Sequence, residues 1–168
     1  ATQSCDELIS IYFFSKDQWA LHNESNVKLD FLYNNLILLE QALKKLNIPL
    51  CVIETKDYES LSDDLTAFAQ LHSVKHIYWN NEFGINEERR DTAVLNALKV
   101  ANIHSTNFID QVIYKPGFLR TGQGKPFSVF TPFKRRWIEN FSIDCLDLKK
   151  PTKSLKQIKL RSDLTPLN

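Results

Sequence analysis

The stretch SNVKLDFLYNNLILLEQALKKLNIPLCVIE, residues 25–54, joins a helix pattern directly to a strand pattern. Its apolar residues first recur at three- and four-residue steps, which indicates an amphipathic helix of about six turns. Ser25 or the preceding Asn23 can cap the start of this helix, and Pro49 ends it because proline cannot continue a helix. The apolar residues that follow, 50–54, predict a strand buried on both faces.

The same alternation extends in both directions along the chain. Short apolar runs predict three further strands, at residues 7–14, 76–79 and 106–113. Periodic stretches predict two further helices, at residues 61–72 and 87–101, the second with Ala93, Val94, Ala97 and Val100 facing inward. This order is typical of a three-layer, Rossmann-like α/β fold with a parallel sheet and helices on both faces. Such sheets bind ligands beyond the carboxyl ends of their strands.

Charge and periodicity divide the chain into three parts. Residues 1–115 form the α/β domain, and residues 116–148 form an irregular segment with one helix, capped by Thr131 and with Pro132 at its first position. Residues 149–168 carry six Lys or Arg and one Asp, a charge of +5, which leaves 15 cations and 19 anions, or −4, on the rest. We expect this basic tail to be a linker to a following domain; contact with phosphate is the alternative.

Composition narrows the class of protein. A chain of 168 residues forms one domain, or one domain with an extension. No apolar run approaches the roughly 20 residues of a membrane span, and no signal peptide is visible. Three cysteines without a CxxC pair favour a reduced, intracellular protein, cytoplasmic or associated with the nucleoid, with Cys51 packed in the core. Because the chain contains no methionine, we expect it to be a piece of a longer polypeptide.

One stretch combines residues suited to ligand binding. YWNNEFGINEERRD, residues 78–91, runs from the end of a strand into the start of a helix, which Asn86 is placed to cap. On the simpler interpretation, residues 88–91 are a solvated charged face. On the functional one, Asn86 and Glu87 project into the cleft and bind a heterocycle with adjacent N–H donors, such as a pterin. His22, after the first strand, is a candidate contact at the same edge.

The remaining motifs point to no other chemistry. The sequence has no glycine-rich phosphate loop, no nucleophile elbow and no convincing metal-ligand spacing. His72 and His76 are interpreted as a helix-end and a strand histidine. Residues 121–137 place aromatic side chains and cations around a helix start. That pattern can indicate a nucleic-acid platform, but we favour packing of the aromatic side chains onto the domain.

Together these stretches resemble the N-terminal part of the photolyase/cryptochrome family, and of its DNA photolyases in particular. The resemblance rests on Trp79-Asn80, on residues 86–91, on Thr121-Gly122 and on residues 129–134 ahead of Trp137. Residues 18–23, QWALHN, resemble the family's segment at the same place. The similarity extends in register over nearly all of residues 1–150.

The resemblance implies a light-harvesting domain. In this family the α/β domain carries an antenna chromophore, 5,10-methenyltetrahydrofolate or a deazaflavin. In the folate-using members a histidine, an asparagine and a glutamate contact the pterin, and these match His22, Asn86 and Glu87. A following helical domain binds FAD and repairs pyrimidine dimers in DNA by blue-light-driven electron transfer. The resemblance therefore implies DNA as the parent protein's partner, no membrane partner, a monomer, and no catalytic residue in this chain.

Two departures from the family limit these expectations. Its members open with a strand and an Arg-Asp-Leu-Arg-like segment, which are absent here, and that strand would be central in the sheet. The helical domain is also absent, so we expect weak antenna binding and no repair by this piece alone. One alternative is a cryptochrome, a blue-light photoreceptor without repair. Another is a generic nucleotide-binding or interaction module, which the absence of a pocket between His22 and Asn86 would favour.

Overall fold

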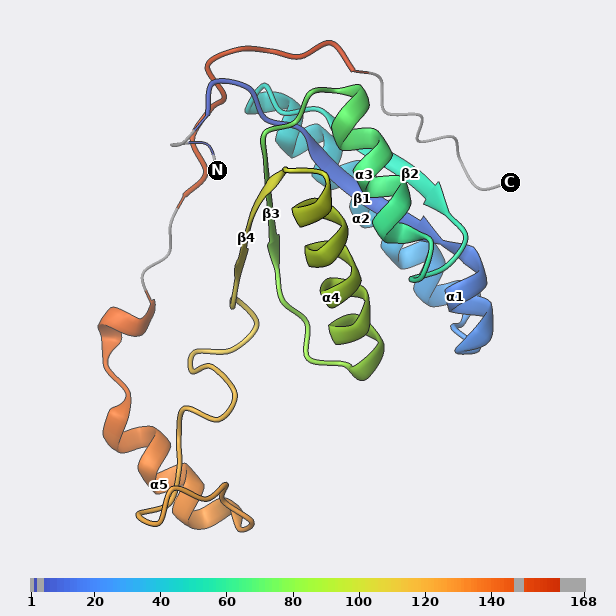
Figure 1. The fold of residues 1–168 in the computed structure, drawn as a ribbon. Helices are drawn as coiled ribbons and strands as arrows, with labels where there is room; N and C mark the ends of the chain where they lie inside the picture. Colours follow the sequence, from blue (N-terminus) through green and yellow to red (C-terminus); the bar gives the residue numbers. More distant parts are fainter. Residues whose placement is uncertain (1, 3–4, 147–149, 161–168) are drawn as a thin grey trace.

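The computed structural model describes residue 2 and residues 5–146 and 150–160, in which parallel strands alternate with helices (Figure 1). The elements are β1 (Ser10–Ser15), α1 (Lys16–Leu21), α2 (Asn26–Lys45), β2 (Leu50–Thr55), α3 (Leu61–Leu71), β3 (His76–Asn80), α4 (Ile85–Val100), β4 (His104–Phe108), α5 (Phe130–Asn140) and the 3-10 turn η1 (Ile143–Leu146). This order confirms the predicted α/β fold.

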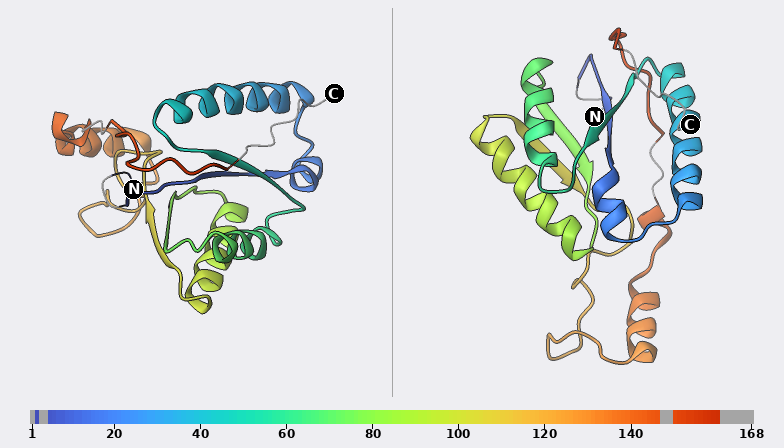
Figure 2. Two further views of the ribbon diagram at one scale, coloured as in Figure 1. Left: turned by 90° about the horizontal axis from the view of Figure 1, so that it is seen from above. Right: turned by 90° about the vertical axis from the view of Figure 1, so that its right-hand side faces the viewer.

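The sheet is built from two parallel pairs of strands. β1 pairs with β2 from Ser10↔Leu50 onward, and β3 pairs with β4 from His76↔His104 onward. Within the described residues no ladder joins β1 to β3. Seen from above, α2 covers one side of the strands and α3 and α4 cover the other (Figure 2). The three predicted layers are therefore present, although the sheet is split in its middle.

Helix α2 begins where the sequence predicts. The Ser25 side chain accepts a hydrogen bond from the backbone N–H of Lys28 at 3.3 Å, which satisfies one of the free donors at the helix start. Leu36 is buried, but Phe31 and Leu39, which belong to the same apolar repeat of three- and four-residue steps, are exposed. The reason is that α2 packs mainly against β2, so that much of its apolar stripe has no neighbour.

The core lies between α3, α4 and the strands. Leu61 and Leu65 pack with Val94 and Leu98, and apolar residues from β1, β3 and the start of β4 lie against them. Val100, expected to face inward, is 85% exposed. It lies six positions after Val94, about 240° further round the helix, and therefore on the opposite side from the core. Leu98, one turn beyond Val94, takes the inward position instead. Cys51 is buried, as predicted.

Several element boundaries differ from the sequence prediction. The segment after the first strand is the helix α1, and its Trp19 packs edge-on against Phe14 with ring centroids 4.3 Å apart. A six-residue helix is too short to show a periodic pattern, so the sequence did not reveal it. β1 begins at Ser10 rather than residue 7. β4 spans His104–Phe108 rather than 106–113, because its pairing with the five-residue β3 ends at Phe108.

Two helix starts also differ. The N-cap of α4 is Gly84, so Asn86 is the second helical residue and not the cap. The N-cap of α5 is Val129, so Thr131 is inside the helix and Pro132 is its third residue. Proline is tolerated there because the first-turn N–H groups have no helical acceptor. α5 has no buried residue and lies apart from the α/β body (Figure 1). Trp137 stacks on Phe141 and meets Tyr114 edge-on.

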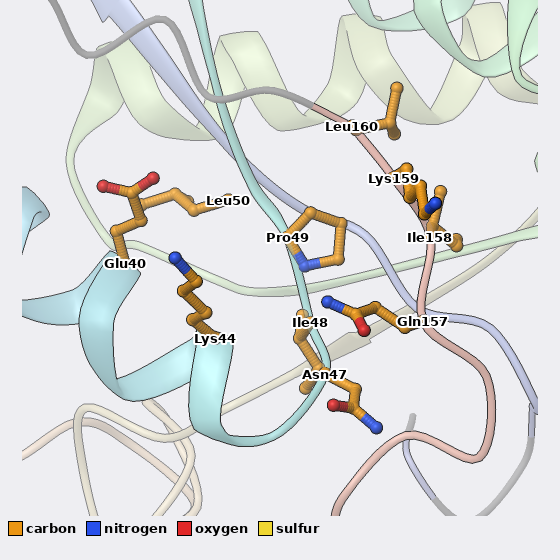
Figure 3. A pocket seen from close by; sticks show the side chains of 10 residues that line it. All are labelled: Glu40, Lys44, Asn47, Ile48, Pro49, Leu50, Gln157, Ile158, Lys159 and Leu160. Carbon is orange, nitrogen blue, oxygen red and sulfur yellow. The ribbon is translucent and has the colours of Figure 1, made fainter.

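The described part of the predicted linker runs back along the body. Ser154 is 3% exposed; its N–H donates to the Leu46 carbonyl at 2.8 Å and its hydroxyl to the Asp6 carbonyl at 2.9 Å. A hollow of about 290 Å³ separates this segment from the end of α2 and the start of β2 (Figure 3). Residues 149 and 161–168 of the predicted tail lie outside the described residues, and the proposed three-part division stays a prediction.

Replacing Ser154 with alanine is expected to lower the free energy of unfolding by about 1–2 kcal/mol, since the hydrogen bond from its buried hydroxyl to the Asp6 carbonyl is lost. The hydroxyl also lies 3.0 Å from the Lys156 carbonyl, so its single proton is shared between two acceptors. Urea denaturation measures the change. Thr152→Ala, in the same segment but exposed, is the control and should change stability by less than about 0.5 kcal/mol. Equal effects of the two substitutions would show that the segment does not dock.

Candidate functional site

Two of the predicted site residues meet beyond the carboxyl ends of the strands. His22 follows α1, which continues from β1, and Asn86 lies in the first turn of α4, which follows β3. The side-chain amide nitrogen Nδ2 of Asn86 lies 3.3 Å from Nε2 of His22, although 64 positions separate them in the sequence. An imidazole and an amide are thus brought into contact at the edge where such sheets bind ligands.

The position of His22 is set by the short helix before it. His22 is the C-cap of α1, and its N–H donates to the Gln18 carbonyl at 3.3 Å. Asn23 then adopts a positive φ of 52°, a conformation that asparagine tolerates better than most residues, and turns the chain toward α2. The packing of Trp19 on Phe14 fixes α1 against the end of β1. His22 itself is exposed.

Glu87, the third predicted residue, follows Asn86 directly on α4, and its side chain makes no contact with His22 or Asn86 that the structure records among the described residues. Its carboxylate folds back over Gly84, where a Cβ atom would overlap it. The absence of a side chain at Gly84 therefore gives the carboxylate its place. A carboxylate in the first turn is also favoured by the partial positive charge of the helix N-terminus. In the part of the chain that the structure describes, the Glu87 carboxylate makes no hydrogen bond, so its acceptor sites are available.

A buried ion-pair cluster lies one turn further along α4. The Arg90 side chain is 15% exposed; it donates to Asp91 at 2.8 Å and to Glu82 at 3.0 Å. Its guanidinium lies over the Tyr58 ring, 5.0 Å from the centroid. Trp79 donates from Nε1 to the other Asp91 oxygen at 3.3 Å. The cluster ties the β3–α4 loop to the first turns of α4, and so holds the segment that presents Asn86 and Glu87.

This cluster corrects the interpretation of residues 88–91 as one solvated face. Glu88 and Arg89 are exposed, but Arg90 and Asp91 face the body. The spacing in the sequence indicates the burial of Arg90. Arg90 precedes Val94 and Leu98 at four-residue steps, so it shares their inward face. Burial opposes the charge on Arg90, but the hydrogen bonds and charges of Asp91 and Glu82 outweigh it and raise its pKa.

The pKa values of two tyrosines near this cluster are also shifted. Burial, with smaller effects from Tyr58 and Glu82, raises the pKa of Tyr12 to about 12. Burial also raises the pKa of Tyr58, although Arg90 acts in the opposite direction. Both tyrosines are therefore neutral at physiological pH and act as hydrogen-bonding or packing groups rather than as bases.

The shift at Tyr12 predicts a loss of stability in alkali. Below pH 10 its hydroxyl is protonated in both the folded and the unfolded chain, so it causes no pH dependence. Between pH 10 and 12 only the unfolded chain ionises, and the free energy of unfolding is expected to fall by about 2–3 kcal/mol in all. Denaturant titrations across this range measure the effect. Tyr12→Phe should flatten the decline, and a decline of unchanged slope would contradict the assignment.

A cleft lies between the two halves of the sheet. It has a volume of about 1410 Å³ and is lined by β1 and β3, by α3 and α4, and at the carboxyl edge by Trp19, Glu82 and Arg90. Neither this cleft nor the hollow of Figure 3 is lined by His22, Asn86 or Glu87. The contact between His22 and Asn86 therefore lies outside both of these cavities, and His22 itself is exposed.

A metal centre with three or more protein ligands and a membrane-spanning helix are not found among the described residues. Among them no group of three or more His, Cys, Asp or Glu side chains is arranged to hold a metal ion. His72 caps the end of α3 and His76 begins β3, as predicted. No helix in the described part of the chain has both the length and the apolar character needed to span a membrane.

Comparison with known proteins identifies relatives along almost the whole chain. The DNA photolyase family model matches residues 1–155. A deoxyribodipyrimidine photo-lyase of Escherichia coli (strain K12) is 32% identical over 136 residues, which cover 81% of this chain and 28% of that protein. The enzyme of the same name from Vibrio cholerae is 28% identical over 151 residues, which cover 90% of this chain and 32% of that protein.

The fold agrees with the sequence match. A crystal structure of a bacterial class III photolyase from Agrobacterium tumefaciens superposes with a TM-score of 0.72 at 22% identity, over 96% of this chain and 33% of that one. The chain spans about a third of the length of these relatives. A family match over residues 1–155 of 168, together with the shared order of strands and helices, shows that the chain belongs to the DNA photolyase family and corresponds to its N-terminal α/β domain.

Proposed function

We propose that this chain is the antenna domain of a deoxyribodipyrimidine DNA photolyase and that it binds 5,10-methenyltetrahydrofolate. The observation that carries the proposal is the 3.3 Å contact between His22 and Asn86, which come from different βα units; Glu87 is the next residue along α4, with its carboxylate over Gly84. The family match and the names of the relatives supply the enzyme class.

The three side chains fit the edge of a pterin ring chemically. A pterin presents neighbouring ring and amino N–H donors, which an ionised carboxylate can accept. We assign that role to Glu87. The Asn86 amide offers one acceptor and two donors and orients the ring, and His22 contacts it from the other side of the site. A bound methenyltetrahydrofolate absorbs near-ultraviolet light and passes the excitation to FAD.

The open position of the site fits a shared binding surface. His22 is exposed, and none of the three residues lines either of the two cavities described above. The relatives are about three times as long as this chain, so we propose that in the intact enzyme a helical domain covers the site. That domain binds FAD and itself repairs pyrimidine dimers in DNA. This chain then contributes no catalytic residue and binds the folate weakly by itself. A deazaflavin in the same place is the alternative chromophore, and a cryptochrome is the alternative parent.

The proposal is tested by titrating the 168-residue chain with 5,10-methenyltetrahydrofolate and following its absorption band. Glu87→Ala is expected to weaken binding by about tenfold, the loss of one charge-assisted hydrogen-bonding group. Glu88→Ala is the matched control, because Glu88 lies in the same helical turn but is exposed. If the effect is specific to Glu87, the Glu88→Ala chain binds 5,10-methenyltetrahydrofolate as tightly as the unchanged chain.

Equal affinities of the Glu87→Ala and Glu88→Ala chains would remove Glu87 from the site. In the intact enzyme, Glu87→Ala should lower antenna retention and leave repair under direct excitation of FAD largely unchanged. Loss of both together would mean that Glu87 acts on folding rather than on chromophore binding.

A second candidate function is a protein-interaction module without a chromophore. The absence of His22, Asn86 and Glu87 from both cavity linings favours it. Under this interpretation the chain binds neither 5,10-methenyltetrahydrofolate nor a deazaflavin at millimolar concentration, and His22→Ala has no effect on any absorption band.

A further inference from the structure

Two histidines lie side by side at the start of the β3–β4 ladder. His76 and His104 are the first pair of its register, although the whole of α4 lies between them in the sequence. Both residues are exposed, and the centroids of their rings are 6.1 Å apart. Backbone pairing of the two strands therefore holds two imidazole rings next to each other at the surface.

The histidine pair lies on the face of β3 and β4 that is turned away from the core between α3 and α4. Ile77 and Trp79 pack against that core, and successive side chains of a strand point to opposite faces of a sheet. His76 and Tyr78 are therefore on the other face, together with His104, the ladder partner of His76. The two strands read HIYWN and HSTNF, without Lys or Arg, so neither strand places a cationic side chain there to repel a bound cation.

Contacts with both strands orient the ring of His76. It stacks on the Tyr78 ring, with centroids 4.2 Å apart and 6° between the planes, and its Nε2 lies 2.7 Å from the hydroxyl oxygen of Thr106. Metal-binding histidines use one ring nitrogen for such a contact, which fixes the tautomer and leaves the lone pair on the other nitrogen. The ring of His104 makes no hydrogen bond in the part of the chain that the structure describes, so it is free to turn toward His76.

We propose that His76 and His104 together bind one Zn²⁺ ion, with water in its remaining coordination positions. Neutral imidazole is the commonest protein ligand of metal ions. Zinc–nitrogen bonds are about 2.0–2.1 Å long, so two nitrogens on one tetrahedral ion lie about 3.3 Å apart. Rotation of the two side chains supplies this spacing from rings whose centroids are 6.1 Å apart. Structural and catalytic zinc sites use four or three protein ligands, so this two-histidine site binds an exchangeable ion.

The zinc site is separate from the proposed chromophore site. His76 and His104 begin their strands, whereas His22, Asn86 and Glu87 lie beyond the carboxyl ends of the strands, at the opposite edge of the sheet. The zinc inference therefore does not rest on the proposed function. A bound ion cross-links β3 to β4, two strands that the sequence joins only through α4, and it stabilises the folded chain in which they are adjacent.

The test is a titration of the isotope-labelled 168-residue chain with zinc chloride, followed by NMR of the imidazole nitrogens. The chain has four histidines, so each can be observed separately. The signals of His76 and His104 are expected to shift together and to saturate at one ion per chain, while those of His22 and His72 stay in place. Equal shifts of all four histidines would overturn the proposal. Unchanged histidine signals at millimolar Zn²⁺, as binding by cysteines alone would give, would also overturn it.

Substitutions identify the two ligands. His104→Gln is expected to weaken Zn²⁺ binding at least about tenfold, since the loss of even an outer partner of a metal-bound histidine costs about 10–100-fold in affinity. His72→Gln is the matched control, because His72 is close to His76 in the sequence but packs on the Phe68 ring, with centroids 4.3 Å apart. It should keep the affinity of the unchanged chain. Equal losses in the two variants would contradict the pairing of His76 with His104.

Thermal unfolding gives an independent readout of the same site. An ion that binds the folded chain in preference to the unfolded one raises the midpoint of unfolding. Zinc at saturation should therefore raise the midpoint of the unchanged chain, and a chelator should reverse the rise. The His104→Gln chain should show no rise. A rise of the same size in both chains would place the ion elsewhere and contradict the proposal.

Discussion

Arg90→Met is expected to lower the free energy of unfolding by about 3 kcal/mol, because it leaves the carboxylates of Asp91 and Glu82 without their cation. The Arg90 and Asp91 side chains are 15% and 13% exposed, so water cannot replace the lost partner fully. Methionine fills a similar volume, which separates the loss of the charge from the loss of packing. Urea denaturation of the full chain measures the change.

Two control variants make this prediction specific. Arg89→Met changes the same residue type one position away, where the side chain is exposed, and should cost less than about 0.5 kcal/mol. Arg90→Lys keeps the charge but not the planar fork that contacts both carboxylates, and should recover only part of the stability. If Arg89→Met and Arg90→Met were equally destabilising, the cluster would not hold the start of α4.

Leu98→Ala is expected to lower the free energy of unfolding by about 3 kcal/mol through lost burial and the cavity left behind. Leu98 is 1% exposed and packs with Leu61, Leu65 and Val94 between α3 and α4. Leu95→Ala, on the outer side of the same helix, keeps helix propensity comparable and should cost less than about 1 kcal/mol. Denaturant midpoints of both variants, at unchanged slope, give the comparison. Equal losses would place the core elsewhere.

Periodicity predicted the architecture because the hydrophobic effect acts on whole faces of elements. The helix over residues 25–46 and its Ser25 cap, the strand at residues 50–54 and the inward position of Val94 follow from spacing alone. Their boundaries depend on partners, which a sequence does not display. β4 ends at Phe108 because β3 ends beside it, and α1 forms because Trp19 packs on Phe14.

The candidate site was predictable only in part. A ligand edge shared by His22 and Asn86 follows from the rule that parallel strands end together, and the structure brings these two residues into contact. The burial of Arg90 and Asp91 was missed, because a charged residue on an inward face was interpreted as solvated. The four-residue spacing from Arg90 to Val94 and Leu98 indicates the inward face, but one of the two carboxylates that make the burial possible, Glu82, lies in the preceding loop.

The central claim is that His22 and Asn86 act together on one chromophore. A double-mutant cycle tests it most directly, with the affinity for 5,10-methenyltetrahydrofolate measured for the unchanged chain, His22→Ala, Asn86→Ala and the double variant. The account predicts that each single substitution weakens binding and that the double variant loses clearly less than the sum of the two losses. Unchanged affinity in either single variant, or strictly additive losses, would contradict it.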